Sequence, residues 1–244
     1  MELFTQFGGA FVSRWFHVLA GITWIGLLYY FNFVQVPAFA QLEPGTRNQA
    51  MDKITWRALW WFRWSALATA GLGILILGFE EHFDGDYFKT PSGLSISIGM
   101  LLGLTMFANV WMIIWPAQQV VIGNARNVLA GGEANPDAPA AARTGALASR
   151  MNTIFSIPML MFMVGTSHFF LSGRYDATES SNRVLFLIIS SVIWAVLELN
   201  ALGIIGGKGQ NASNWMYETH RNAIISGFAL AAIYYLLFEL ILSA

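Results

Sequence analysis

Because the chain contains no cysteine, a metal or a haem iron would have to be held by His, Met, carboxylate or backbone groups, and the four histidines are the first candidates. Two of the four, His17 and His168, lie inside long apolar segments, where an ionisable side chain is costly and marks a functional candidate. His17 lies early in the first apolar segment and His168 late in the fourth. If these two segments cross a membrane in opposite directions, the imidazole of His17 lies roughly 10 Å and that of His168 roughly 6 Å below the same surface.

The residues around His17 have the spacing that an edge-on porphyrin needs. Arg14, His17, Gly21 and Trp24 fall on one face of a helix. Gly21 leaves room for the ring, Trp24 would pack on it, and Arg14 lies one turn nearer to water, where a guanidinium would pair with a haem propionate. The first segment therefore predicts one side of a b-type haem site.

The fourth segment offers a matching pattern, because Gly165 precedes His168 by three residues. The hypothesis is a b-type haem with His17 and His168 as axial ligands. Two alternatives stay open: both imidazoles only form hydrogen bonds between packed helices, or they bind copper or another metal together with His82. No catalytic residue follows from the sequence.

The composition indicates the elements that must position these residues. Of the 244 residues 56% are hydrophobic and only 11% are charged, whereas soluble domains carry about a quarter charged residues. Ten tryptophans and seven tyrosines suit the two interfaces of a membrane. The net charge of -1 gives no reason to expect nucleic acid as a partner.

Apolar runs of the roughly 20 residues that span a bilayer predict an all-α, polytopic bundle of transmembrane helices, a single domain over residues 1–244. The main partner of the bundle is then the lipid bilayer. The first apolar run is expected to stay in the protein as a membrane span and not to be a cleaved signal peptide. The connection 124–150, rich in Ala, Gly and Pro, is expected to be a mobile loop, and Pro116 is expected to kink or end the third span. The predicted spans are 10–39, 58–79, 94–118, 151–171, 184–205 and 216–242.

Basic residues set the expected orientation. Four Lys and Arg residues lie on the side of the termini and nine on the other side, so the nine are placed in the cytoplasm. In a bacterial inner membrane both termini are then periplasmic. The acidic rim on the periplasmic side would receive a basic soluble protein or form a solvated surface; it consists of Glu80, Glu81, Asp84, Asp86, Asp176 and Glu179.

Other polar residues in the spans are less specific. Asn109, Glu198 and Asn200 are expected to form hydrogen bonds between helices, with a proton relay through Glu198 as the alternative. An aromatic and cationic cluster opens the second span, and it suggests an interfacial anchor or a site for a planar anion. Its members are Trp56, Arg57, Trp60, Trp61, Arg63 and Trp64.

Three stretches, 17–32, 109–119 and 149–169, resemble the membrane domain of the bacterial cytochrome-c-linked urate oxidase (urate hydroxylase) family, and the likeness extends over nearly the whole chain. More distantly, His17 followed by Trp24-x-Gly26 is similar to the pattern in membrane protoporphyrinogen oxidases and copper-resistance D-type proteins. A haem b is implied in the first of these. The resemblance therefore implies a redox role and favours haem at His17.

One departure from the family is the lack of a Cys-x-x-Cys-His motif, which its C-terminal cytochrome c domain carries. Electrons would then pass to a separate periplasmic cytochrome c. The sequence thus predicts a membrane-embedded redox protein, a candidate urate-oxidase-like oxidoreductase. The alternatives are a non-catalytic subunit of a larger membrane redox or photosynthetic complex, and a transporter of metal or solute.

Overall fold

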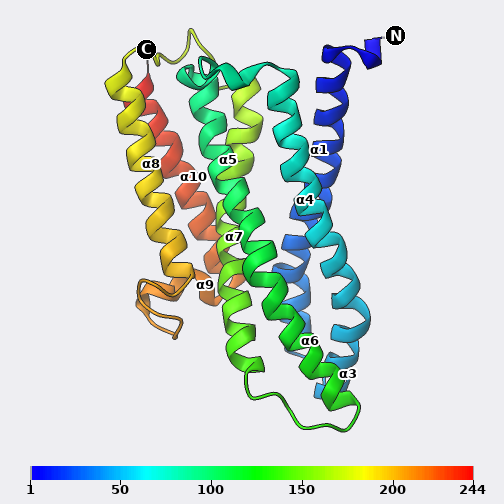
Figure 1. The fold of residues 1–244 in the computed structure, drawn as a ribbon. Helices are drawn as coiled ribbons and strands as arrows, with labels where there is room; N and C mark the ends of the chain where they lie inside the picture. Colours follow the sequence, from blue (N-terminus) through cyan, green and yellow to red (C-terminus); the bar gives the residue numbers. More distant parts are fainter. Residues whose placement is uncertain (1, 244) are drawn as a thin grey trace.

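The computed structural model describes residues 2–243, with the exception of the side chain of Asp84, and this part of the chain contains helices and no β-strand (Figure 1). The all-α bundle predicted from the sequence is confirmed. The α-helices are α1 (Gln6–Tyr29), α2 (Val36–Phe39), α3 (Pro44–Ala50), α4 (Trp56–Phe79), α5 (Pro91–Asn109), α6 (Trp115–Leu129), α7 (Ala138–His168), α8 (Ser180–Ala201), α9 (Trp215–Glu218) and α10 (His220–Leu242).

Three π-helical segments join neighbouring α-helices into longer rods. The segment η2 (Tyr30–Gln35) joins α1 to α2, η3 (Met51–Thr55) joins α3 to α4, and η6 (Val110–Ile114) joins α5 to α6. With these joined rods, the structure has six helices that are long and apolar enough to cross a membrane. They are Gln6–Phe39, Pro44–Phe79, Pro91–Leu129, Ala138–His168, Ser180–Ala201 and His220–Leu242.

Two regions differ from the sequence-based expectations. Most of the connection 124–150 is helical, since α6 continues to Leu129 and α7 begins at Ala138; alanine, which is abundant there, has the highest helix propensity. Pro116 does not end its helix: it lies in the first turn of α6, directly after the π-helical segment η6, and the rod continues to Leu129.

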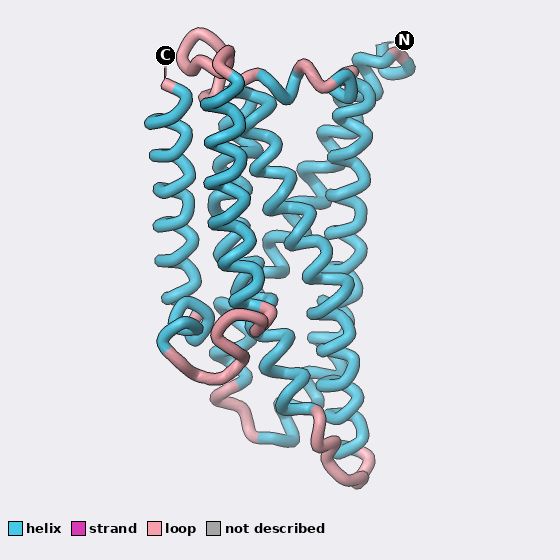
Figure 2. The backbone as a smooth tube through the Cα atoms, turned by 60° about the vertical axis from the view of Figure 1, so that its left-hand side comes forward, coloured by secondary structure: helices cyan, strands magenta, loops and turns pink. Residues whose placement is uncertain are grey.

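Four of the six rods are longer than a bilayer requires. The rods α8 and α10 have 22 and 23 residues, about 33–35 Å at 1.5 Å per residue, which matches a bilayer. The other four have 31 to 39 residues. Their excess lies at one end of the bundle, where α3 and α6 reach beyond α9 (Figures 1 and 2). This extension is on the side predicted to be cytoplasmic.

Helix α7 forms the centre of the bundle. In its most apolar stretch 67% of the residues are buried, against 22–33% in the other five rods. It packs on α5, α6 and α10, while α1 packs mainly along α4. Large apolar side chains such as Phe7, Phe11, Ile188 and Leu240 face outward, as expected of a surface covered by lipid.

Hydrogen bonds between helices hold polar side chains in the core. Asn109 Nδ2 donates to Asn152 Oδ1 at 3.0 Å and to Glu198 Oε2 at 3.3 Å, and Asn152 Nδ2 donates to the Met106 carbonyl at 3.0 Å. Asn109 and Glu198 therefore link α5, α7 and α8, as expected. Asn200 instead bonds the Ile205 carbonyl and Asn214 at the end of α8.

The Asn152→Leu substitution is expected to lower the free energy of unfolding by about 1–3 kcal/mol, because it leaves buried partners without their hydrogen bonds. Gln119→Leu, at an exposed position outside the cavity wall, is the control and should change it by about 0.5 kcal/mol or less. Thermal unfolding in detergent measures both variants. Equal effects would contradict a structural role for the Asn152 network.

Candidate ligand cavity

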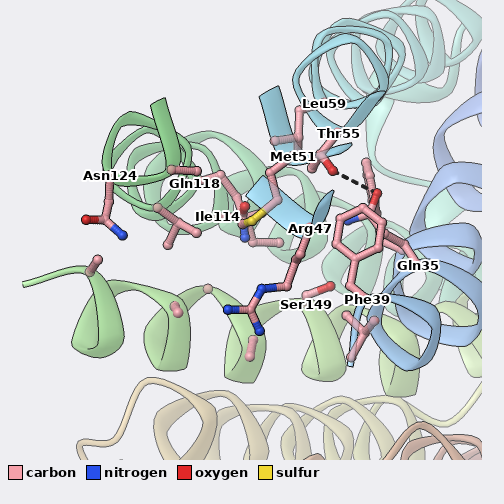
Figure 3. Close-up of a pocket in the computed structure, with 18 of the residues that line it drawn as sticks. Gln35, Phe39, Arg47, Met51, Thr55, Leu59, Ile114, Gln118, Asn124 and Ser149 are labelled. Atoms are coloured by element: carbon pink, nitrogen blue, oxygen red, sulfur yellow. Dashed lines mark hydrogen bonds between the residues drawn. The ribbon is translucent and has the colours of Figure 1, made fainter. Parts of the chain in front are cut away.

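A cavity of about 580 Å³ lies in the extended end of the bundle. Its walls come from η2 and α2, from α3, η3 and the start of α4, from η6 and α6, and from the first turns of α7 (Figure 3). The cavity is large enough for a small organic molecule. It was not expected from the sequence.

Small side chains leave this space open. Ala138, Ala142, Gly145 and Ala146 recur at helical spacing on the face of α7 that lines the cavity, and Ala125 lines it from α6. A β-carbon at Gly145 would lie 3.2 Å from the β-carbon of Ala117, so α6 and α7 approach closely beside the cavity. The alanine-rich sequence thus explains why the cavity is empty of side chains.

All three π-helical segments contribute to the wall. Asn32 and Gln35 come from η2, Met51 and Thr55 from η3, and Ile114 from η6. The Thr55 hydroxyl donates to Gln35 Oε1 at 3.0 Å and so links η3 to η2 (Figure 3). Because π-helical turns inside α-helices are frequent at functional sites, their meeting at one cavity marks it as the candidate site.

Arg150 supplies a buried positive charge to the cavity. Only 7% of the residue is exposed, and its Nε donates to Asn32 Oδ1 at 2.7 Å. Its Nη1 is buried without a hydrogen-bond partner, and no carboxylate among the described residues forms a salt bridge with it. Glu218 interacts with Arg150 only through space, without a direct salt bridge. A buried cation without a directly bonded counter-charge is costly, so a bound anion would stabilise this arrangement.

The remaining lining suits a flat, hydrogen-bonding anion. Arg47 points into the cavity from α3 (Figure 3), and none of the described lining residues is Asp or Glu. Phe31 and Phe62, whose rings meet edge to face with centroids 5.4 Å apart, provide an apolar wall. Side-chain amides offer both donors and acceptors; they belong to Asn32, Gln35, Asn48, Gln118, Asn124 and Asn135.

His17 lies in the other half of the bundle, at the packed interface of α1 and α4. Its Nδ1 is 2.8 Å from the Thr69 carbonyl oxygen, which only accepts, so Nδ1 carries the hydrogen and Nε2 keeps a free lone pair. A β-carbon at Gly73 would lie 3.2 Å from His17 Cε1, whereas one at Gly21 would meet only Thr69 Cγ2 at 3.9 Å. The imidazole is therefore oriented by a backbone carbonyl, as metal-bound histidines usually are.

His168 is exposed at the end of α7. Its Nδ1 is 3.0 Å from the Val164 carbonyl oxygen of its own helix, which again leaves Nε2 as the free acceptor. The space beside Gly165 holds the Phe170 ring, whose Cε2 would be 2.5 Å from a β-carbon at Gly165. The two imidazoles lie on two different helices, each bonded to a different backbone carbonyl, and no hydrogen bond or ring contact joins them in the described part of the chain.

Two further residues of the predicted haem site are Arg14 and Trp24, of which one is ion-paired and the other is buried. Arg14 forms an ion pair with Glu80, which follows α4. Trp24 is 2% exposed, and its Nε1 has no hydrogen-bond partner. Fifteen residues of helix separate His17 from Asn32, about 22 Å along the axis, so the imidazole and the cavity are separate regions.

The acidic rim is partly neutralised. Glu80 pairs with Arg14 and lies 3.4 Å from His82 Nε2. Lys89 bonds to Asp86 at 2.6 Å and lowers the pKa of that carboxyl. Hydrogen bonds from Thr178 lower the pKa of Asp176. The side chain of Asp84 lies outside the described residues.

The described residues include no group of three or more His, Cys, Asp or Glu side chains that could hold a metal ion. His82, which the copper alternative requires, stacks on Tyr87 with ring centroids 3.6 Å apart. A three-ligand metal site with His82 therefore finds no support.

Comparison with protein families gives one match, over α5 to α8. Residues 88–202 match the model of the urate oxidase N-terminal family. The match supports the urate-oxidase-like character that the sequence motifs suggested. No curated protein and no solved structure matches the chain.

The urate-oxidase-like segment contributes one side of each candidate region. It includes Arg150, Gln118 and Ile114 of the cavity and also His168, whereas Asn32 and His17 lie before it. Sequence reasoning missed Arg150 because it was counted as a loop cation. The signal that could have revealed it is the pair Asn32 and Arg150, two strongly polar residues in or beside apolar spans.

Proposed function

We propose that this chain is a membrane redox protein of the urate oxidase type, which binds urate or a closely related planar anion in the cavity. Arg150 supports this proposal most strongly, because this cavity-lining side chain carries a positive charge and a buried donor, Nη1, that has no hydrogen-bond partner, and none of the described lining residues is a carboxylate. The family match over residues 88–202 names the compound class.

The chemistry of the lining fits such a ligand. Urate is flat and anionic at neutral pH, and N–H and C=O groups alternate along its edge. Arg150 would pair with the anionic edge through a charge-assisted hydrogen bond. The amides of Asn32 and Gln118 offer donors and acceptors to the other edge atoms, while Phe31 and Phe62 border its apolar faces.

A b-type haem is the proposed electron carrier. The free Nε2 atoms of His17 and His168 are suitable axial donors, each oriented through its Nδ1 by a carbonyl, and a β-carbon at Gly21, one turn from His17, would meet only Thr69. Two residues of the site would have to change their contacts to meet the haem. Gly165 would have to lose the Phe170 ring that fills the space beside it, and Arg14 would have to leave Glu80. When bound, the haem would supply one-electron transfer.

The two regions suggest a direction for the reaction across the inner membrane. Urate would enter the cavity from the side predicted to be cytoplasmic. Hydroxylation of urate by water releases two electrons and two protons, and the electrons would leave at the opposite, periplasmic end, where the acidic rim would dock a basic cytochrome c. Each urate oxidised would then reduce two molecules of ferricytochrome c.

Blocking the cavity tests this proposal. Ala146→Phe places a ring in the space that Ala146 now lines, so urate-dependent reduction of added ferricytochrome c by membranes containing the protein should fall at least about tenfold. Ala140→Phe, on the same helix but not in the cavity wall, is the control and should keep the wild-type rate. Wild-type membranes without any urate-dependent reduction would favour the non-catalytic subunit instead.

A further inference from the structure

A second, basic and aromatic recess lies on the outer side of η3, α4 and α6. It has a volume of about 400 Å³ and is separate from the ligand cavity. Its lining residues are Asp52, Lys53, Trp56, Arg57, Trp60 and Arg126. Three of these six are cations and one is an acid.

The cations exceed what Asp52 can neutralise. Asp52 bonds to Lys53 Nζ at 2.7 Å and to Arg126 Nε at 2.5 Å. The Arg57 Nη1 donates to the Lys53 carbonyl at 2.5 Å, and no described carboxylate forms a salt bridge with Arg57. The recess therefore keeps a net positive charge beside a solvent-exposed guanidinium.

Aromatic rings pack against a cation of the recess and extend beyond it along α4. Arg126 Cζ lies 4.6 Å from the centre of the Trp56 ring, which packs on Trp115 with centroids 5.2 Å apart. Trp60 and Trp61 are 48% and 60% exposed, so their rings face outward just beyond the cations. Tryptophans with exposed rings of this kind collect at the boundary of a bilayer.

The depth of the recess agrees with the headgroup layer. Counted from Phe79 at the other end of the rod, Trp60 is about 28 Å away and Arg57 and Lys53 are about 33 and 39 Å away at 1.5 Å per residue. A hydrocarbon core is about 30 Å thick. With Phe79 at one border of the hydrocarbon core, Trp60 would lie at the opposite border, and the cations would lie at the depth of the phosphates.

We infer that this recess binds the phosphate of an anionic phospholipid, with Arg57, Lys53 and Arg126 around the phosphate and the acyl chains against Trp60 and Trp61. Charge complementarity and depth favour a lipid over a soluble anion. The site does not depend on the proposed redox function, because it shares no lining residue with the ligand cavity.

Native mass spectrometry of the purified full chain tests the inference. Protein from vesicles of phosphatidylglycerol and phosphatidylcholine in equal amounts should retain phosphatidylglycerol preferentially. The double variant Lys53→Gln, Arg57→Gln should lower this retention about tenfold. The control Lys208→Gln, Arg221→Gln removes the same charge elsewhere and should retain the lipid like wild type.

Three outcomes would overturn the inference. The first is equal retention of the two lipids by the wild type, and the second is unchanged preference in the Lys53, Arg57 variant. The third is displacement of the lipid by millimolar inorganic phosphate alone, which would make free phosphate the ligand. Circular dichroism and thermal unfolding of the double variant distinguish loss of the site from loss of the fold.

Discussion

Arg150→Met weakens urate binding by about one to two orders of magnitude in our account, since a hydrogen bond to a charged group contributes about 1.5–3 kcal/mol. The substitution keeps a long apolar side chain in place of the guanidinium, so the shape of the cavity changes little. Calorimetric titration of the purified protein with urate measures the effect. Wild-type affinity in Arg150→Met would contradict the assignment.

The stability of the same variant separates binding from folding. Removing a buried cation that has no direct salt bridge offsets the loss of its bond to Asn32, so we expect the free energy of unfolding to change by less than about 1 kcal/mol. Arg143→Met is the contrasting control, because Arg143 pairs with Glu218 at 2.6 Å outside the cavity wall. That variant should lose stability and keep urate affinity.

His17→Ala and His168→Ala should each abolish the low-spin b-type haem spectrum that we expect of the wild type. Each substitution removes one axial nitrogen, and an iron with a single imidazole is no longer six-coordinate through the protein. Reduced-minus-oxidised difference spectra, together with haem content per chain, measure the change. His220→Ala is the control, since His220 begins α10 at the opposite end of the bundle, and it should keep the wild-type spectrum.

The result of the haem measurement does not depend on whether the cavity binds urate. If both single variants keep an unchanged spectrum, the haem has other ligands. If the wild type is colourless after purification and haem supplementation, the haem proposal fails, while the urate affinity of the cavity can still be measured. The two predictions therefore fail separately.

Most of the fold could be predicted, because membrane-spanning helices are local features. Apolar runs of 20 or more residues located all six rods without any knowledge of their packing. The extension of the rods beyond the bilayer was not predicted, because the apolar runs are bounded by charged or polar residues, near Arg57 and Gln118. Residues 124–150 form mainly helix even though their Ala, Gly and Pro content suggested a loop.

The candidate site could be predicted only in part. His17 and His168 stood out as ionisable residues in apolar segments, and the spacing around them could be read directly. The cavity requires four rods to converge, and no sequence pattern predicted a π-helical turn such as η2. Arg63 illustrates the same limit: the sequence placed it in an interfacial cluster, whereas its Cζ lies 3.9 Å from the centre of the Trp115 ring.

The location of bound urate tests the central claim most directly. A structure of the full chain determined with urate should show density for a flat molecule in the cavity, within hydrogen-bond distance of Arg150 Nη1 and bordered by Phe31 and Phe62. An empty cavity at saturating urate, or urate bound elsewhere in the bundle, would contradict the account.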